Sequence, residues 1–229
     1  SPVDLYVGKP NSAQHPLNFQ AKWLNSEKGG SVPQDVMDSV LDSNDVTFRT
    51  KNDDNGGAAI YNLKGDLSIS NSNITNNLKD IVIRNGNAGD LLVGVVVTSG
   101  ETVITGSYFA NNTGSWGGAI SSLGYMNDES YLLSIKNSKF EGNNATFGGA
   151  IFVESSKLEV ENCTFENNKG LGVGSSGTSN TQGGAIIVHP AQSSVSITDS
   201  TFTGNSANVG AAVSLSRVDG DSIIENCTF

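Results

Sequence analysis

Short runs of alternating apolar and polar residues recur along most of this 229-residue chain. Leu67 and Ile69 stand two residues apart in one such run, and Leu158 and Val160 do so in another. Period-two placement of apolar side chains is typical of a β-strand that buries one face. No segment with a helical period interrupts the runs, so the pattern predicts an all-β fold.

The runs belong to a repeated unit marked by two tetrapeptides, Phe-x-x-Asn and Gly-Gly-Ala-Ile. The copy that starts at Phe140, for example, is followed by the glycine block that starts at Gly148. Phe-type anchors occupy positions 48, 74, 109, 140, 165, 202 and 229, at spacings of 25 to 37 residues. A period of this length is typical of one coil of a solenoid.

Aligning the copies on their anchors gives columns of similar residues. Before the anchors lie residues that tolerate a left-handed backbone, namely Asp45, Asn71, Gly106, Asn137, Asn162, Asp199 and Asn226. Three residues after the anchors lie Asn77, Asn112, Asn143, Asn168 and Asn205, with Lys51 in the first copy. The first column predicts a bend and the second a ladder of amides that bond along the axis. The glycine pair predicts a second corner.

Together these columns predict a right-handed parallel β-helix of about seven coils over residues 43–229. The right hand is the default because nearly all crossovers between parallel strands have it. The pattern stops in mid-coil at Phe229, so we expect this segment to belong to a longer repeat protein.

Residues 1–42 lack the repeat and are expected to form a cap. Ser31 and Pro33, followed by apolar Val36 and Leu41, suit the start of a short amphipathic helix. Such a helix would cover the open apolar end of the stack, as terminal repeats require.

Three insertions interrupt the coils, within residues 78–92, 121–131 and 169–182. Loops on a rigid scaffold are the usual contact surface of a binding protein. We therefore single out Tyr125, Met126 and Tyr131 in the second insertion, and Trp116 before a glycine pair, as candidate partner contacts. The alternative is that these side chains only pack over the flank of the coil.

Charge and hydropathy narrow the range of partners. Thirteen basic and 23 acidic residues give a net charge of −10, which argues against nucleic acid and anionic membranes. The longest apolar run, residues 91–97, is far shorter than the roughly 20 residues that a spanning helix needs. Any membrane attachment is expected to lie outside this segment.

The ordered pairing of Phe-x-x-Asn with Gly-Gly-Ala-Ile resembles the passenger repeats of the chlamydial polymorphic outer membrane proteins. Similar repeats occur in adhesin-like surface proteins of other bacteria and archaea. The resemblance covers residues 43–229 and rests on four near-complete pairs of motifs. It implies a secreted β-helix, displayed on the outer membrane or cell wall, that binds a protein or glycan on a host or neighbouring cell.

Candidate chemistry is sparse. Cys163 and Cys227 share a column two coils apart, near 10 Å, which is too far for a disulfide. His189 is expected at the surface because no Ser, Cys or second His accompanies it in the pattern. The acidic pairs lie in separate turns, with weak calcium binding at residues 52–55 or 219–221 as the alternative to simple solvation. We expect no catalytic residue, no cofactor and no metal.

The sequence thus favours a non-catalytic, surface-exposed adhesion domain. Two alternatives remain open. One is a carbohydrate-active β-helix enzyme of the polysaccharide lyase or hydrolase type. The other is a structural wall or filament component that associates with copies of itself.

Overall fold

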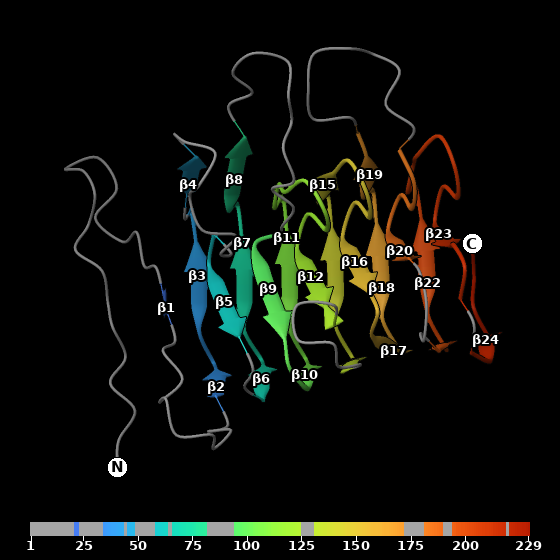
Figure 1. Ribbon diagram of the computed structural model, residues 1–229, viewed down its shortest axis with the longest axis horizontal. Helices are drawn as coiled ribbons and strands as arrows, with labels where there is room; N and C mark the ends of the chain where they lie inside the picture. Colours follow the sequence, from blue (N-terminus) through green and yellow to red (C-terminus); the bar gives the residue numbers. More distant parts are fainter. Residues whose placement is uncertain are drawn as a thin grey trace.

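The computed structural model describes residues 21–22, 34–43, 45–48, 58–63, 66–81, 94–124, 131–171, 181–189, 194–218 and 220–229. Across these ranges the chain is all-β, and the strands stack side by side along the long axis (Figure 1). The described ranges contain no α-helix, hence none that could cross a membrane. The predicted all-β fold with stacked parallel strands is confirmed.

Three parallel sheets form the stack, and every described strand pair in them is parallel (Figure 1). Sheet 1 consists of β1 (Ala21–Lys22), β5 (Ile60–Leu63), β9 (Val96–Ser99), β12 (Ile120–Leu123), β16 (Ile151–Glu154), β20 (Ile186–His189) and β23 (Val213–Leu215). Sheet 2 consists of β2 (Gln34–Met37), β6 (Leu67–Ser70), β10 (Thr102–Thr105), β13 (Leu132–Lys136), β17 (Lys157–Glu161), β21 (Val195–Thr198) and β24 (Ser222–Glu225). Sheet 3 consists of β3 (Val40–Asp42), β7 (Asn73–Thr75), β11 (Tyr108–Ala110), β14 (Lys139–Glu141), β18 (Thr164–Glu166) and β22 (Thr201–Thr203).

Two short pairs extend the coils beyond sheet 3. They are β4 (Asp45–Phe48) with β8 (Leu78–Ile81), and β15 (Asn144–Ala145) with β19 (Lys169–Gly170). Each repeat unit, called a coil below, therefore runs through sheet 2, sheet 3 and sheet 1 before the next unit begins.

The interior is built of similar residues stacked coil on coil. Ile104, Ile135, Val160 and Ile197 follow one another in register along sheet 2 and are all buried. The anchor phenylalanines of sheet 3 stack face to face, with ring centroids 4.8 to 5.0 Å apart from Phe109 to Phe229. This spacing equals the strand separation, so each ring lies directly on the ring of the next coil.

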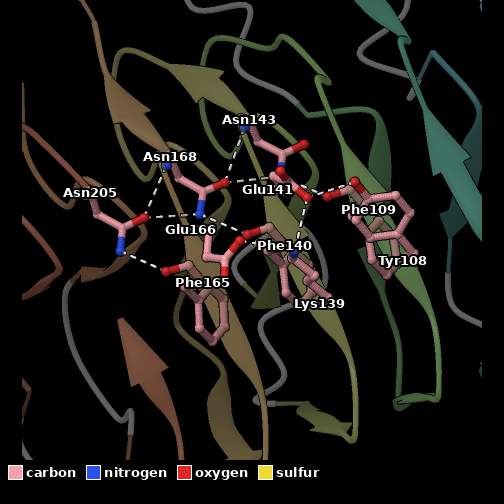
Figure 2. A network of polar contacts seen from close by, with 10 residues as sticks. All are labelled: Tyr108, Phe109, Lys139, Phe140, Glu141, Asn143, Phe165, Glu166, Asn168 and Asn205. Carbon is pink, nitrogen blue, oxygen red and sulfur yellow. Dashed lines mark hydrogen bonds and ion pairs between the residues drawn. The ribbon is translucent and has the colours of Figure 1, made fainter. Parts of the chain in front are cut away.

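The predicted asparagine ladder is confirmed. The side-chain amide of Asn143 donates to Oδ1 of Asn168 at 2.9 Å and to the backbone oxygen of Phe109 at 3.0 Å (Figure 2). Its backbone N–H donates to the same Oδ1 at 3.0 Å, and its own Oδ1 accepts from Asn112. The same bonds recur at Asn77, Asn112 and Asn168, so these buried amides are satisfied.

The predicted corners are also confirmed by the backbone. Asn71, Asn137, Asn162 and Asp199 have φ between 49° and 51°, as the bend column requires. At the second corner Gly148 has a φ of 63°, and a Cβ placed there would lie 2.1 Å from the oxygen of Ile151. Only glycine tolerates both conditions.

The helix predicted near residues 34–42 is wrong. These residues form β2 and β3, in which Val36 pairs with Ile69 and Leu41 pairs with Ile74. Both side chains pack against the core, so a strand pairing that buries them overrides the weak helical pattern. Whether residues 1–42 form a separate cap stays a prediction, although β2 and β3 already belong to the sheets.

The alignment of the first copy is corrected by the same register. Leu41, not Phe48, lies at the anchor position beside Ile74, and Phe48 pairs with Ile81 in the short extension. Asp38, with a φ of 47°, takes the bend position that the alignment of the repeats assigned to Asp45. Because Phe48 is aromatic like the other anchors, the alignment of the first copy was displaced by seven residues. Lys51, which the alignment placed in the asparagine column, lies outside the described residues.

Candidate functional site

The outer face of sheet 1 carries apolar side chains although it lies outside the core. In β16 and β20 the residues Phe152 and Ile187 alternate with inward-facing neighbours and lie side by side in register. Leu123 of β12 joins them, and all three are at most 3% exposed. Large buried side chains on the outside of a coil require other groups to cover them.

The corner that leads into sheet 1 provides part of this cover. The Trp116 ring lies 4.7 Å from the Phe152 ring, and Phe147 lies edge-on to Trp116 at 6.1 Å. Trp116 and Phe147 also form a backbone bridge, one coil apart. The Ser121 hydroxyl donates to the backbone oxygen of Trp116 and accepts from the N–H of Gly94 at 2.7 Å, which fixes the corner.

A carboxylate continues this face two residues beyond Phe152. Glu154 is partly buried at the end of β16, and its Oε2 atom is buried with no hydrogen-bond partner among the described residues. Burial disfavours the charged form, so the pKa of Glu154 is raised above its usual value. An unpaired buried carboxylate oxygen is rare in folded proteins and has room for a hydrogen-bond donor from a bound group.

His189 occupies the same position one coil further along. It pairs with Glu154 in the register of β16 and β20, about 4.8 Å away along the axis. Burial, followed by the positive charge of Arg217, lowers the pKa of His189. The imidazole is therefore neutral at physiological pH and offers one donor and one acceptor.

These residues form one arrangement, which we call the flank site: Trp116, Phe147, Phe152, Glu154 and His189. It combines aromatic rings, a carboxylate that lacks a partner and a neutral imidazole on one face of the stack. Such a combination can bind a ligand that has both an apolar face and hydrogen-bonding groups. A carboxyl with raised pKa beside an imidazole can also transfer protons.

The outer face of sheet 3 carries a second group, which we call the polar network: Tyr108, Lys139, Glu141 and Glu166 (Figure 2). Lys139 Nζ lies 2.9 Å from a carboxylate oxygen of Glu141 and 2.9 Å from one of Glu166. The Tyr108 hydroxyl donates to Glu141 at 2.7 Å. Each charged group has partners and remains 35 to 40% exposed.

Electrostatics within the polar network favour the charged forms of Glu141 and Lys139 and the neutral form of Tyr108. Hydrogen bonds from Tyr108 and then Lys139 lower the pKa of Glu141. Bonds to Glu166 and Glu141 raise the pKa of Lys139, and the bond to Glu141 raises that of Tyr108. Glu141 therefore stays ionised, whereas Lys139 and Tyr108 keep their protons.

The four residues that the sequence singled out as candidate partner contacts lie in different environments. Trp116 packs on Phe152 and is partly exposed, so it both covers the flank and belongs to the flank site. Tyr131 is partly exposed, and its backbone oxygen accepts from Lys157 at 2.7 Å where β17 begins. Tyr125 and Met126 lie outside the described residues.

The two cysteines and the possible metal ligands were the other candidates for chemistry. Cys163 is buried and Cys227 is partly buried, and both are free thiols, as the sequence predicted. Burial raises the pKa of Cys163 to about 11, so its thiol is unreactive. Among the described residues, no three His, Cys, Asp or Glu side chains gather as a metal site.

Sequence reasoning missed Glu154 and the pairing of Glu141 with Glu166. The signal was available for the first, because Glu154 and His189 stand at the same offset, six residues after the first glycine of their blocks. Glu141 and Glu166 likewise each follow an anchor phenylalanine. Comparing outward columns across coils would have brought both pairs together.

Comparisons with known proteins concern a small part of the chain. Residues 1–50 match a family described as a domain of unknown function, DUF2610. An uncharacterized protein of Rickettsia prowazekii (strain Madrid E) is 49% identical over 42 residues, which cover 18% of this chain and 39% of that protein. The match thus spans less than half of the relative's length. No solved structure matches. The family match ends before the residues of the flank site begin.

Proposed function

We propose that this chain is a surface-displayed, non-catalytic adhesion domain that attaches its cell to a protein or glycan on a host or neighbouring cell. In this proposal the stack is a right-handed β-helix of about seven coils, and it lies outside the cell, on the outer membrane or wall. The repeat of Phe-x-x-Asn and Gly-Gly-Ala-Ile supports it, since the repeat resembles those of adhesin-like passengers.

One observation carries the proposal: the flank site presents partly exposed aromatic rings and an unpartnered carboxylate on a rigid stack. The polar network, in contrast, has its charges already paired. A rigid surface with unmet binding capacity suits recognition because little entropy is lost on binding.

Binding of the purified chain to cells tests the proposal. We expect saturable binding of the fluorescently labelled protein in flow cytometry, reduced by Trp116→Ala and unchanged by Thr164→Ala on sheet 3. Binding that never saturates, or that both variants reduce equally, would contradict a specific adhesion site.

A second candidate function is a carbohydrate-active enzyme, favoured by the register pairing of Glu154 with His189. The carboxyl with raised pKa would act as the acid and the neutral imidazole as the base. Release of new reducing ends from a polysaccharide, abolished by Glu154→Gln, would favour the enzyme over the adhesin. Absence of product across neutral and acidic polysaccharides would favour the adhesin.

A further inference from the structure

We propose that the flank site binds a neutral sugar unit, which stacks against Trp116 and donates a hydroxyl hydrogen bond to the Glu154 carboxylate. This inference rests on the proposed function and names the chemical class of the partner, a neutral glycan. It is carried by Trp116, Phe152, Glu154, His189 and Arg217, all within the described residues.

The unsatisfied oxygen of Glu154 sets the first requirement on a ligand. The Oε2 atom is buried and accepts no hydrogen bond from the described residues, which is unfavourable for a carboxylate oxygen. A ligand that supplies a donor satisfies this oxygen. The Glu154 side chain as a whole keeps partial exposure, so a bound group meets Oε2 once the carboxylate turns toward the outer face.

The spacing along β16 sets the second requirement. Phe152 and Glu154 lie on the same face two residues apart, about 7 Å along the strand. Because Trp116 packs on Phe152, an aromatic surface and a hydrogen-bond acceptor belong to the same outer face. A sugar ring has an apolar C–H face and hydroxyl groups around its edge, which fits both.

The charges around the site select among ligands with donors. An ammonium group would approach the Glu154 carboxylate but also Arg217, whose positive charge already acts on the neighbouring His189. A carboxylate or phosphate would approach Arg217 but also Glu154. A neutral polyhydroxyl ligand avoids both repulsions, and the neutral imidazole of His189 can donate to one of its oxygens and accept from another hydroxyl.

The polar network on sheet 3 differs from the flank site because its hydrogen-bonding groups already have partners. Glu141 and Glu166 already accept charge-assisted bonds from Lys139, and Tyr108 is bound to Glu141. A ligand there would have to replace bonds that exist instead of making one that is missing. It therefore offers a matched control for the flank site.

A series of trisaccharides that differ in charge tests the ligand class. The probes are chitotriose, which is neutral, its deacetylated form, which is cationic, and trigalacturonate, which is anionic, together with an array of neutral glycans. We expect binding to at least one neutral glycan, measured by isothermal titration calorimetry, and at least about tenfold weaker binding of the charged trisaccharides.

Variants then locate the site. Glu154→Gln and Trp116→Ala should each weaken binding of the neutral glycan about tenfold, whereas Trp116→Phe should retain most of it. Glu166→Gln makes the same chemical change in the polar network and should leave binding within about twofold. Circular dichroism of each variant shows whether the stack has folded, and any variant that has not is replaced by His189→Asn, for which we expect a smaller loss.

The outcomes separate this inference from the proposed function. No binding to any neutral glycan, preference for a charged trisaccharide, or equal losses for Glu154→Gln and Glu166→Gln would overturn the inference. If the chain still binds cells in that case, the adhesion proposal stands with a protein partner. If soluble neutral glycans bind at the flank site but cells do not, the inference stands and the adhesion proposal fails.

Discussion

The outer faces of sheet 1 and sheet 3 have the same parallel strand arrangement but differ in the burial and hydrogen bonding of their side chains. On sheet 1, Phe152 and Ile187 are nearly fully buried, and Glu154 lacks a partner for one oxygen. On sheet 3, Lys139 and its two glutamates stay 35 to 40% exposed, and the lysine pairs with both carboxylates. The difference begins at the corner before sheet 1, which folds Trp116 back over the strand face.

This comparison teaches that burial on the outside of a solenoid is decided by its corners. With the same strand spacing, the outer face of a sheet can be either buried or exposed to solvent. Where a corner covers the face, apolar side chains are buried and stabilised. Where the described residues leave the face open, ion pairs form in high dielectric and contribute little. Four experiments test this distinction.

The largest effect is expected from Phe152→Ala. It removes a ring that is 3% exposed and takes from Trp116 the nearer of its two aromatic neighbours, so the free energy of unfolding should fall by about 3 to 5 kcal/mol. Thr164→Ala on sheet 3 should change it by less than about 0.5 kcal/mol. Chemical denaturation measures both, and equal losses would show that the two faces are equivalent.

A smaller effect of opposite sign is expected from Glu154→Leu. The pKa of Glu154 is raised in the folded state, so its contribution to stability is fully present below its usual pKa of 4.5 and is lost as pH rises through the folded value. The variant should therefore be more stable than the wild type at pH 8, by on the order of 1 kcal/mol. The difference should shrink at pH 4, as followed by thermal unfolding.

The neighbouring imidazole should show the reverse pH dependence. Because the pKa of His189 is lowered, its contribution is present above the usual value of 6.5 and is lost as pH falls through the folded value. His189→Asn should therefore weaken the loss of stability between neutral and mildly acidic pH. An unchanged acid limb in the variant would mean that His189 is as well solvated as the groups of sheet 3.

The smallest effect is expected from Lys139→Met. This variant removes both ion pairs of the polar network, yet exposed pairs contribute less than about 1 kcal/mol. The loss should decrease further in 1 M salt, where screening acts over only about 3 Å. A loss that persists in high salt would show that the polar network is less hydrated than its exposure indicates.

Most of the stack could be predicted from the sequence because each coil repeats the same constraints. The bend at Asn137, the ladder through Asn143 and the corner at Gly148 each follow from a residue type with few other uses. The prediction for the first coil was wrong because Leu41 and Val36 are ordinary apolar residues. Only their pairing with β7 and β6 shows that they belong to the repeat.

The flank site was less predictable for a different reason. Trp116 was identified, but its contact with Phe152 depends on how the corner folds, which no spacing in the sequence gives. Glu154 looked like one surface acid among many, because its partial burial arises only in the folded chain. Burial produced by a corner is a tertiary effect, invisible to strand periodicity.

The asparagine ladder has a consequence for how such a gene can change. Asn143 bonds to Asn112 on one side and Asn168 on the other, and both partners occupy the same position in their own coils. Duplicating or deleting one repeat unit would therefore give each remaining asparagine a partner identical to the one it lost. The length of the protein can evolve in whole coils without new interior contacts, while the corners diverge independently and acquire new binding surfaces.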